Sequence, residues 1–191
     1  MANRGYKRKK GGGCAFIFFG GLLFLITLFI LVLSRDRVNP REEYLENTKY
    51  LAMEVSKKYK LFPSVTLAQS ALESNFGRSE LSTEYKNYFG IKSNSGENAV
   101  GLNTSEYIDG EEVTLKENFR RYNTKEESFN DYAKLITEAG RYESVRRAKN
   151  YEEAAVALYE SGYATDPNYS QKIIDLIEEY NLHELDIETI N

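Results

Sequence analysis

The sequence predicts a mostly helical domain with one β-hairpin, preceded by a single transmembrane helix. Three observations lead to this prediction: a long apolar run near the N-terminus, apolar residues at helical spacing through most of the remaining chain, and one Asp-Gly turn signal between two extended stretches. The chain has 191 residues, and the part after the apolar run has the length of one domain. It contains no internal repeat, so we expect one compact unit.

Residues 14–33, CAFIFFGGLLFLITLFILVL, contain no charged side chain. At about 1.5 Å per residue, a helix of this length spans the roughly 30 Å hydrocarbon core of a bilayer. Basic residues without acidic neighbours precede it, so we expect residues 1–13 to be a cytoplasmic tail and the rest of the chain to be outside. A cleaved signal peptide and a buried helix of a soluble protein are the alternatives. The apolar run is longer than the usual apolar region of a signal peptide, and no A-x-A cleavage site follows it. The sequence therefore favours an uncleaved, single-pass membrane anchor.

Residues 34–39 form a short polar connector, which reaches about 20 Å when fully extended. The extracytoplasmic domain that follows, residues 40–191, is therefore expected to stay close to the membrane. Without the five basic residues of the N-terminal tail, the chain keeps 20 basic against 29 acidic residues, a net charge of about −9. A nucleic-acid partner is not expected, because a surface that binds phosphates needs a basic patch.

Apolar spacing or capping signals predict four helices, over residues 40–60, 64–76, near 125–139 and near 151–161. Gly77 is expected to close the second helix, and Asp166-Pro167 to open a fifth and last one. Between the second and third helices, LNTSEYIDGEEVTLKENF forms two extended stretches around Asp109-Gly110. This dipeptide favours a tight hairpin turn, so the helical domain should carry one hairpin lobe.

Composition restricts the chemistry that the domain can perform. The chain has one cysteine, Cys14, and one histidine, His183, so disulfide frameworks, zinc clusters and histidine-dependent triads are largely excluded. Carboxylates, hydroxyls and amides remain, and we expect neither a metal nor a cofactor. His183 itself is expected to be solvated in a polar C-terminal tail.

Glu73 lies in the stretch TLAQSALESNFGRS, residues 66–79. On a helix it borders the apolar stripe, one residue after Leu72 and three before Phe76. The C-terminal end of the helix dipole and the apolar neighbours both disfavour its negative charge, so its pKa should be raised. A glutamic acid that stays protonated near neutral pH can donate a proton to a glycosidic oxygen. An edge glutamate that reaches solvent is the alternative.

Four separated motifs occur in order: SVTLAQSALESNFGRSEL, KNYFGIK, TSEYIDGEEVTLKENFRRY and SGYATDPNYSQKI. Together they resemble the peptidoglycan N-acetylglucosaminidases of glycoside hydrolase family 73, relatives of the flagellar rod glucosaminidase domain, over about residues 44–182. The resemblance implies a lysozyme-like α+β fold and an endo-β-N-acetylglucosaminidase that acts on peptidoglycan glycan strands. Alternatives are a muramidase or lytic transglycosylase on the same fold, and an inactive wall-binding or scaffold protein.

The resemblance implies three catalytic residues: Glu73 as the general acid, Glu106 of TSEY as the second acidic residue, and Tyr163 of SGYATDP as the active-site tyrosine. Glu106, Tyr163 or the substrate's own acetamido group would stabilise the oxocarbenium-like centre. In the predicted strand, Glu106 can point into a groove while Tyr107 points away. A register slip would reverse these faces, so Glu111 and Glu112 remain rival second carboxylates.

Four further residues are candidates for substrate binding: Asn87, Phe89, Tyr122 and Asp166. The amide of the first suits an acetamido group, and the two aromatic rings offer flat faces to sugars. Each has a structural alternative. For Phe89 and Tyr122 it is core packing, and for Asn87 and Asp166 it is capping of a turn or helix.

The short connector predicts that the natural substrate is membrane-proximal, newly made glycan. The sequence does not identify a partner membrane protein.

Overall fold

The computed structural model describes residues 39–94, 96, 98–108 and 111–190. The chain divides into two units between Asn39 and Pro40, and the second unit is the one described below. Among the described residues, no helix has the length and the apolar character needed to cross a membrane. The predicted span, residues 14–33, lies outside the described residues, as do the predicted tail and most of the connector.

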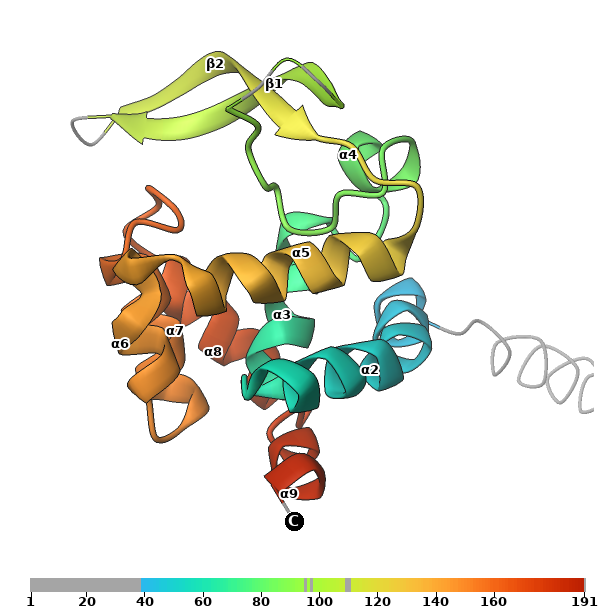
Figure 1. Cartoon of the computed structure of the whole chain (residues 1–191), viewed down its shortest axis with the longest axis vertical. Coiled ribbons are helices and arrows are strands. Elements are labelled where there is room, and N and C mark those ends of the chain that lie inside the picture. The colour runs from blue at the N-terminus through green and yellow to red at the C-terminus, as the bar shows by residue number, and fades with distance from the viewer. Residues whose placement is uncertain (1–38, 95, 97, 109–110, 191) are drawn as a thin grey trace, which may run out of the picture. The chain divides into compact units, whose positions relative to one another are not determined.

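The second unit is mostly helical and carries one two-stranded antiparallel sheet, which confirms this part of the predicted fold. The helical segments are α2 (Pro40–Tyr59), α3 (Pro63–Glu73), α4 (Glu80–Thr83), α5 (Lys125–Glu138), the 3₁₀ turn η1 (Gly140–Tyr142), α6 (Glu143–Arg147), α7 (Tyr151–Glu160), α8 (Tyr169–Glu179) and α9 (Glu184–Ile190). The strands are β1 (Ala99–Ile108) and β2 (Glu111–Arg120). Figure 1 shows the hairpin at one end of the helical body and α9 at the other.

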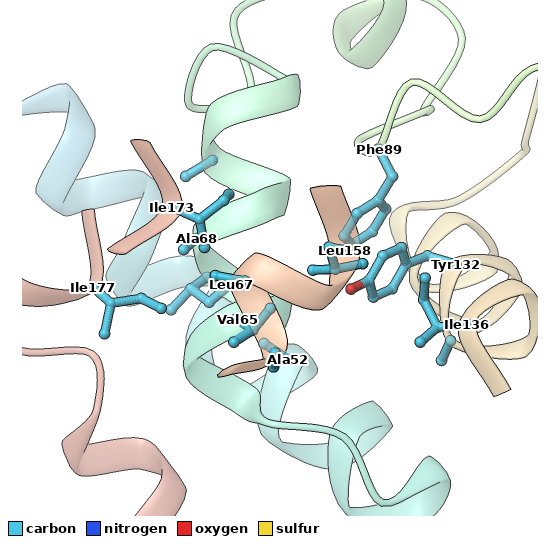
Figure 2. Packing of buried hydrophobic residues seen from close by; sticks show 14 of the residues in the cluster. Ala52, Val65, Leu67, Ala68, Phe89, Tyr132, Ile136, Leu158, Ile173 and Ile177 are labelled. Atoms are coloured by element: carbon cyan, nitrogen blue, oxygen red, sulfur yellow. The ribbon is translucent and has the colours of Figure 1, made fainter. Parts of the chain in front are cut away.

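Helix α3 lies at the centre of the helical body, where it packs against α2, α7, α8 and α9. Residues 63–71 of this helix are all buried, although several of them are polar. Figure 2 shows Val65 and Leu67 of α3 among apolar side chains of other helices, including Ile173 and Ile177 of α8. Removal of this apolar surface from water stabilises the fold by about 25 cal/mol per Å².

The buried polar side chains of α3 are hydrogen-bonded to neighbouring helices. The Ser64 N–H donates to Asp186 Oδ1 (2.9 Å) and Ser64 Oγ donates to Asp186 Oδ2 (2.7 Å), so α9 caps the N-terminus of α3. Ser56 Oγ of α2 donates to Thr66 Oγ1 (2.9 Å). Because a buried polar group without a partner is costly, these bonds fix α3 relative to both neighbours.

The C-terminal segment differs from the predicted polar, solvated tail. It forms α9, which packs against α2 and α3 and buries Asp186. The His183 ring stacks on Tyr151 with ring centroids 6.2 Å apart, and its Nδ1 is buried without a hydrogen-bond partner in the described part of the chain. The prediction that His183 is solvated is therefore wrong, because the segment around it packs onto the helical body.

Helix α3 ends at Glu73, three residues before the predicted end at residue 76. The next residues reverse the chain direction through three successive left-handed conformations, with φ of 49° at Asn75, 54° at Phe76 and 72° at Gly77. Ser74 Oγ accepts a hydrogen bond from the Gly77 N–H (2.7 Å) and stabilises this turn. Glu73 is therefore the last helical residue, with its side chain at the end of the buried helix.

The strands β1 and β2 pair in the register that places Glu106 opposite Val113. This pairing confirms the predicted hairpin, whereas the Asp109-Gly110 turn lies outside the described residues. At the base of the hairpin, Lys92 of the KNYFGIK loop forms an isolated β-bridge with Phe119 of β2. The backbone of this loop therefore joins the hairpin to the helical body.

We predict that Gly77→Ala destabilises the domain and that Gly140→Ala does not. A Cβ atom at Gly77 would lie 2.8 Å from the Tyr44 ring, and the φ of 72° disfavours any side chain. The expected loss is about 1–3 kcal/mol in the free energy of unfolding. At Gly140 no described atom lies within 4 Å of such a Cβ. Chemical denaturation followed by circular dichroism measures both variants, and equal midpoints for the two would contradict the prediction.

Candidate active site

A cleft of about 850 Å³ lies between the hairpin and the helical body. Its wall includes the end of α3, the KNYFGIK loop, both strands and the segment between α7 and α8. In Figure 1 this last segment, drawn in orange, rises from the helices toward the hairpin. Glu73, Glu106, Tyr163 and Asp166 all line the cleft. The tertiary structure therefore brings together all three predicted catalytic residues and two of the four predicted binding residues, Phe89 and Asp166.

Glu73 is held in the cleft wall by burial and by one hydrogen bond. Tyr169 Oη of α8 donates to Glu73 Oε1 (2.8 Å). Burial raises the pKa of Glu73 to about 7; the hydrogen bond from Tyr169 opposes this shift, and the negative charge of Glu106 adds to it. A carboxyl group with this pKa is protonated in about half of the molecules at neutral pH. The side chain can therefore donate a proton under these conditions.

Gly90 of the KNYFGIK loop leaves room for the carboxyl group of Glu73. Its φ is 63°, in the left-handed region, and a Cβ atom there would lie 3.4 Å from Glu73 Oε2. A larger side chain at this position would have to occupy the space beside that oxygen. Glycine is therefore favoured both by the backbone conformation and by the close approach of Glu73.

Asn87 shapes the loop that carries Gly90. Its Nδ2 donates to the carbonyl oxygens of Ile91 and Arg120 (3.0 Å each), and its Oδ1 accepts from the Ile91 N–H (3.1 Å). The residue is only 1% exposed. The structure contradicts the predicted role of Asn87 in substrate binding, because its amide is buried and used within the loop. The alternative, a turn-capping role, is the one observed.

The two aromatic candidates also have structural roles. The Phe89 side chain is buried and stacks on Tyr132 with ring centroids 4.0 Å apart, as Figure 2 shows. Tyr122 lies in a separate polar hollow outside the cleft, where its Oη donates to Asp131 Oδ2 (2.6 Å). Phe89 thus shows the structural alternative of core packing, although the residue is part of the cleft wall, and Tyr122 lies away from the cleft.

Glu106 is held in its charged form by two neighbours. Lys92 Nζ lies 2.7 Å from its Oε1, and Thr165 Oγ1 donates to its Oε2 (2.8 Å). Burial alone would raise the pKa of Glu106, but the hydrogen bonds from Lys92 and Thr165 and the Lys92 charge hold that pKa below its usual value. Thr165 also accepts from the Tyr107 N–H (3.0 Å), which joins β1 to the segment before α8. Tyr107 is more exposed than Glu106, and both residues line the cleft.

The rival carboxylates of the hairpin have different surroundings. Glu111 pairs with Ile108 near the turn and is outside the cleft wall, whereas Glu112 lines the cleft. Both are exposed. Glu106 is the carboxylate whose charge acts on Glu73. The geometry and the electrostatics therefore favour Glu106 over both rivals.

Tyr163 stands beside the acid as a neutral phenol. Its Oη donates to the Phe89 carbonyl oxygen (2.8 Å), and its ring stacks on Tyr169 with ring centroids 5.9 Å apart. Burial holds the pKa of Tyr163 well above its usual value, and the nearby Glu73 adds to this shift. The hydroxyl proton is thus directed into the loop.

Asp166 lines the cleft, but its carboxylate is already paired. Its Oδ1 accepts from the Asn168 N–H (2.9 Å) and its Oδ2 from Lys172 Nζ (2.5 Å). This turn precedes α8, which begins at Tyr169, two residues after Pro167 and later than predicted. Asp166 therefore closes the turn before the helix, whereas the N-cap residue of α8 is Asn168.

Sequence reasoning missed Lys92 and Thr165, which contact the carboxylate of Glu106, and Gln69, which donates a hydrogen bond to Tyr169. Tyr169 is the hydrogen-bond donor to Glu73 and is not among the predicted site residues. Gln69 lies four residues before Glu73, and this spacing on one helix face is the signal that could have identified it. Among the described residues, no group of three or more His, Cys, Asp or Glu side chains could hold a metal ion.

Comparisons with known proteins match this chain to one family. The model of the glucosaminidase family, described as mannosyl-glycoprotein endo-β-N-acetylglucosaminidase, matches residues 49–182. The exo-glucosaminidase LytG of Bacillus subtilis is 38% identical over 156 residues, which cover 79% of this chain and 55% of LytG. The peptidoglycan hydrolase FlgJ of Salmonella typhimurium is 39% identical over 119 residues, which cover 59% of this chain and 38% of FlgJ.

The similarity extends to solved structures. The crystal structure of the catalytic domain of the autolysin Auto from Listeria monocytogenes has a TM-score of 0.66 and 36% sequence identity, and the match covers 79% of this chain and 90% of that domain. By contrast, this chain spans about half of LytG and less than half of FlgJ. The matched region contains Glu73, Glu106 and Tyr163.

We predict that Glu73→Gln stabilises the protein at pH 8 but not at pH 4. Between the unfolded pKa of 4.5 and the folded pKa of about 7, the unfolded chain binds fewer protons at Glu73, so stability falls as the pH rises through this window. Glutamine keeps the shape and avoids this loss. The expected gain at pH 8 is about 1–3 kcal/mol in the free energy of unfolding.

Chemical denaturation at both pH values measures this difference. Glu111→Gln is the control, because Glu111 is exposed and should leave the stability nearly unchanged at either pH. A Glu73→Gln effect of equal size at pH 4 and pH 8 would show that the acid is not destabilised by burial.

Proposed function

The chain belongs to the glucosaminidase family of peptidoglycan hydrolases, and from this premise we propose that it is an endo-β-N-acetylglucosaminidase. Its target would be the β-1,4 bond between N-acetylglucosamine and N-acetylmuramic acid. The observation that carries the proposal is that two carboxyl groups line one cleft: Glu73, whose pKa burial raises to about 7, and Glu106, whose pKa Lys92 and Thr165 hold below its usual value. Glycoside hydrolysis requires two carboxyl groups whose pKa values are pushed apart in this way.

In the proposed reaction, Glu73 is the general acid. Its carboxyl proton passes to the glycosidic oxygen while the bond from that oxygen to C1 breaks, and Glu73 becomes a carboxylate. The positive charge that develops at C1 is stabilised by the carboxylate of Glu106. Water then adds to C1 and releases a proton, so one water molecule is consumed for each bond broken and Glu73 is protonated again.

Tyr163 has a supporting role in this proposal. Its hydroxyl proton is donated to the Phe89 carbonyl oxygen and its pKa is raised, so it does not supply a phenolate nucleophile. Its oxygen keeps lone pairs that can accept a hydrogen bond from the substrate. The 2-acetamido group of the substrate is the remaining source of stabilisation at C1.

We also propose that the enzyme acts close to the membrane, on newly made glycan strands. Support comes from the sequence: residues 14–33 have the length and composition of an anchor, and basic residues precede them. Helix α2 begins at Pro40, so the six residues 34–39 separate the proposed anchor from the folded domain. A connector of this length holds the cleft within a few tens of Å of the bilayer, by the reach of an extended chain.

Digestion of purified peptidoglycan tests the enzymatic proposal. After borohydride reduction, mass spectrometry should find N-acetylglucosamine at the new reducing ends and fragments from within the strands. Glu73→Gln should lower kcat roughly 10²–10⁴-fold, because the amide keeps the shape but has no acid proton to donate. Glu106→Gln should also lower kcat strongly, whereas Glu111→Gln should leave it within about twofold.

Other products would identify other activities. Reduced N-acetylmuramic acid at the new ends would indicate a muramidase, and anhydromuramic ends would indicate a lytic transglycosylase. A wild-type protein that releases no fragments would leave only a wall-binding or scaffold role. A larger effect of Glu111→Gln than of Glu106→Gln would move the second carboxylate to the hairpin turn.

A variant with a long flexible insert after Ser34 tests the proposed location. We expect the natural chain to shorten pulse-labelled, newly made strands in cells, and the variant with the insert to reach older strands as well. The length distributions of labelled and unlabelled glycan strands measure both effects. Equal cutting of old and new strands by the natural chain would refute the membrane-proximal role, and the enzymatic assignment would not depend on that result.

A further inference from the structure

We propose that Tyr132, Gln69 and Tyr169 are positioning residues, joined in a hydrogen-bonded relay that places the acid proton of Glu73 on Oε2, the oxygen beside Gly90. The inference rests on the proposed function, because it concerns how the general acid presents its proton. It assigns to three buried side chains a role beyond packing.

The relay consists of three hydrogen bonds between three helices. Tyr132 Oη of α5 donates to Gln69 Oε1 of α3, and Gln69 Nε2 donates to Tyr169 Oη of α8 (2.8 Å). Tyr169 Oη then donates to Glu73 Oε1 (2.8 Å). The three relay residues are each at most 3% exposed, so water does not compete for these bonds.

The Gln69 amide sets the direction of the relay. An amide has separate donor and acceptor atoms, so a hydroxyl that meets Oε1 must donate and one that meets Nε2 must accept. Tyr132 meets the first atom and Tyr169 meets the second. Because the Tyr169 oxygen accepts from Gln69, its own proton is directed to Glu73 Oε1.

This direction determines which oxygen of Glu73 carries the acid proton. A proton on Oε1 would point at the proton of Tyr169, and two hydrogens cannot share that short contact. The acid proton is therefore placed on Oε2. That oxygen lies beside Gly90, where a Cβ atom would be 3.4 Å away, and both residues line the cleft. The relay thus presents the proton to the cleft and not to the core.

The groups that face Glu73 come from several elements. They are Tyr132 of α5, Tyr163 of the segment before α8, Tyr169 of α8 and Glu106 of β1. Burial raises the pKa of each of these three tyrosines, so they stay neutral when Glu73 titrates. Glu106 is the charged member of the set, and the relay does not include it. A change in the relay therefore acts on Glu73 through hydrogen bonding alone.

Two variants interrupt the relay without changing Glu73. Tyr169→Phe removes the donor to the Glu73 carboxylate. Gln69→Met keeps the approximate size of the side chain but leaves the Tyr169 oxygen free to accept the acid proton from Oε1. Both changes favour the protonated form of Glu73. Tyr142→Phe is the matched control, because Tyr142 is also a buried tyrosine, 6.1 Å from the Tyr163 ring, and is not a member of the relay.

The test is a carbon-13 NMR titration of the Glu73 carboxyl group in the full chain, held in detergent micelles and assigned by comparison with Glu73→Gln. Tyr169→Phe and Gln69→Met should each raise the measured pKa of Glu73 by about one unit. Tyr142→Phe should leave it unchanged. On peptidoglycan, the two relay variants should lower kcat about tenfold with little change in KM, and the alkaline limb of the pH profile should move upward with the measured pKa.

An unchanged titration of Glu73 in both relay variants would overturn the relay, whether or not the protein hydrolyses peptidoglycan. If Gln69→Met does not fold, as judged by thermal unfolding, the titration of Tyr169→Phe alone decides. A wild-type protein that titrates as expected but releases no glycan fragments would refute the proposed function instead. The NMR measurement therefore separates the two failures.

Discussion

The burial of helix α3 is the constraint on which the rest of the structure depends. The helix is enclosed along almost its whole length, yet it carries several polar side chains. A buried polar group without a partner costs roughly 1–3 kcal/mol, so each neighbouring element must supply one. Asp186 of α9 accepts a hydrogen bond from Ser64, and Ser56 of α2 donates one to Thr66. These pairings fix how α2 and α9 pack against α3, and neither helix can shift without breaking one of them.

The same burial produces the reactive group at the end of the helix. Glu73 is the last residue of α3, and the surroundings that stabilise the helix disfavour its charge. Glu106 lies on the hairpin instead, where Lys92 and Thr165 stabilise its charged form. One cleft therefore contains two carboxyl groups whose pKa values are shifted in opposite directions. The raised pKa of Glu73 is unfavourable for stability near neutral pH, which is a common compromise at sites that perform chemistry.

The position of the hairpin over the helices depends on a few long-range hydrogen bonds. Thr165 joins the segment before α8 to both Glu106 and Tyr107 of β1. Asn87 joins the loop of Gly90 to the end of β2 through Arg120. Both residues belong to motifs that resemble the family, and their hydrogen bonds hold the walls of the cleft together. The motifs therefore contain residues that hold the cleft in place as well as the candidate catalytic residues.

The sequence by itself determined the helical character of the domain through apolar spacing, and the hairpin through an Asp-Gly turn signal. It also placed Glu73 beside the apolar stripe of a helix. Each of these patterns is a property of neighbouring residues. It also located Glu106 and Tyr163 through the resemblance. Only the tertiary structure decided that α3 ends at Glu73 and that Tyr169, 96 residues away in the chain, donates to it. Burial, pKa and hydrogen-bond partners depend on residues that are distant in the chain, and local patterns do not contain that information.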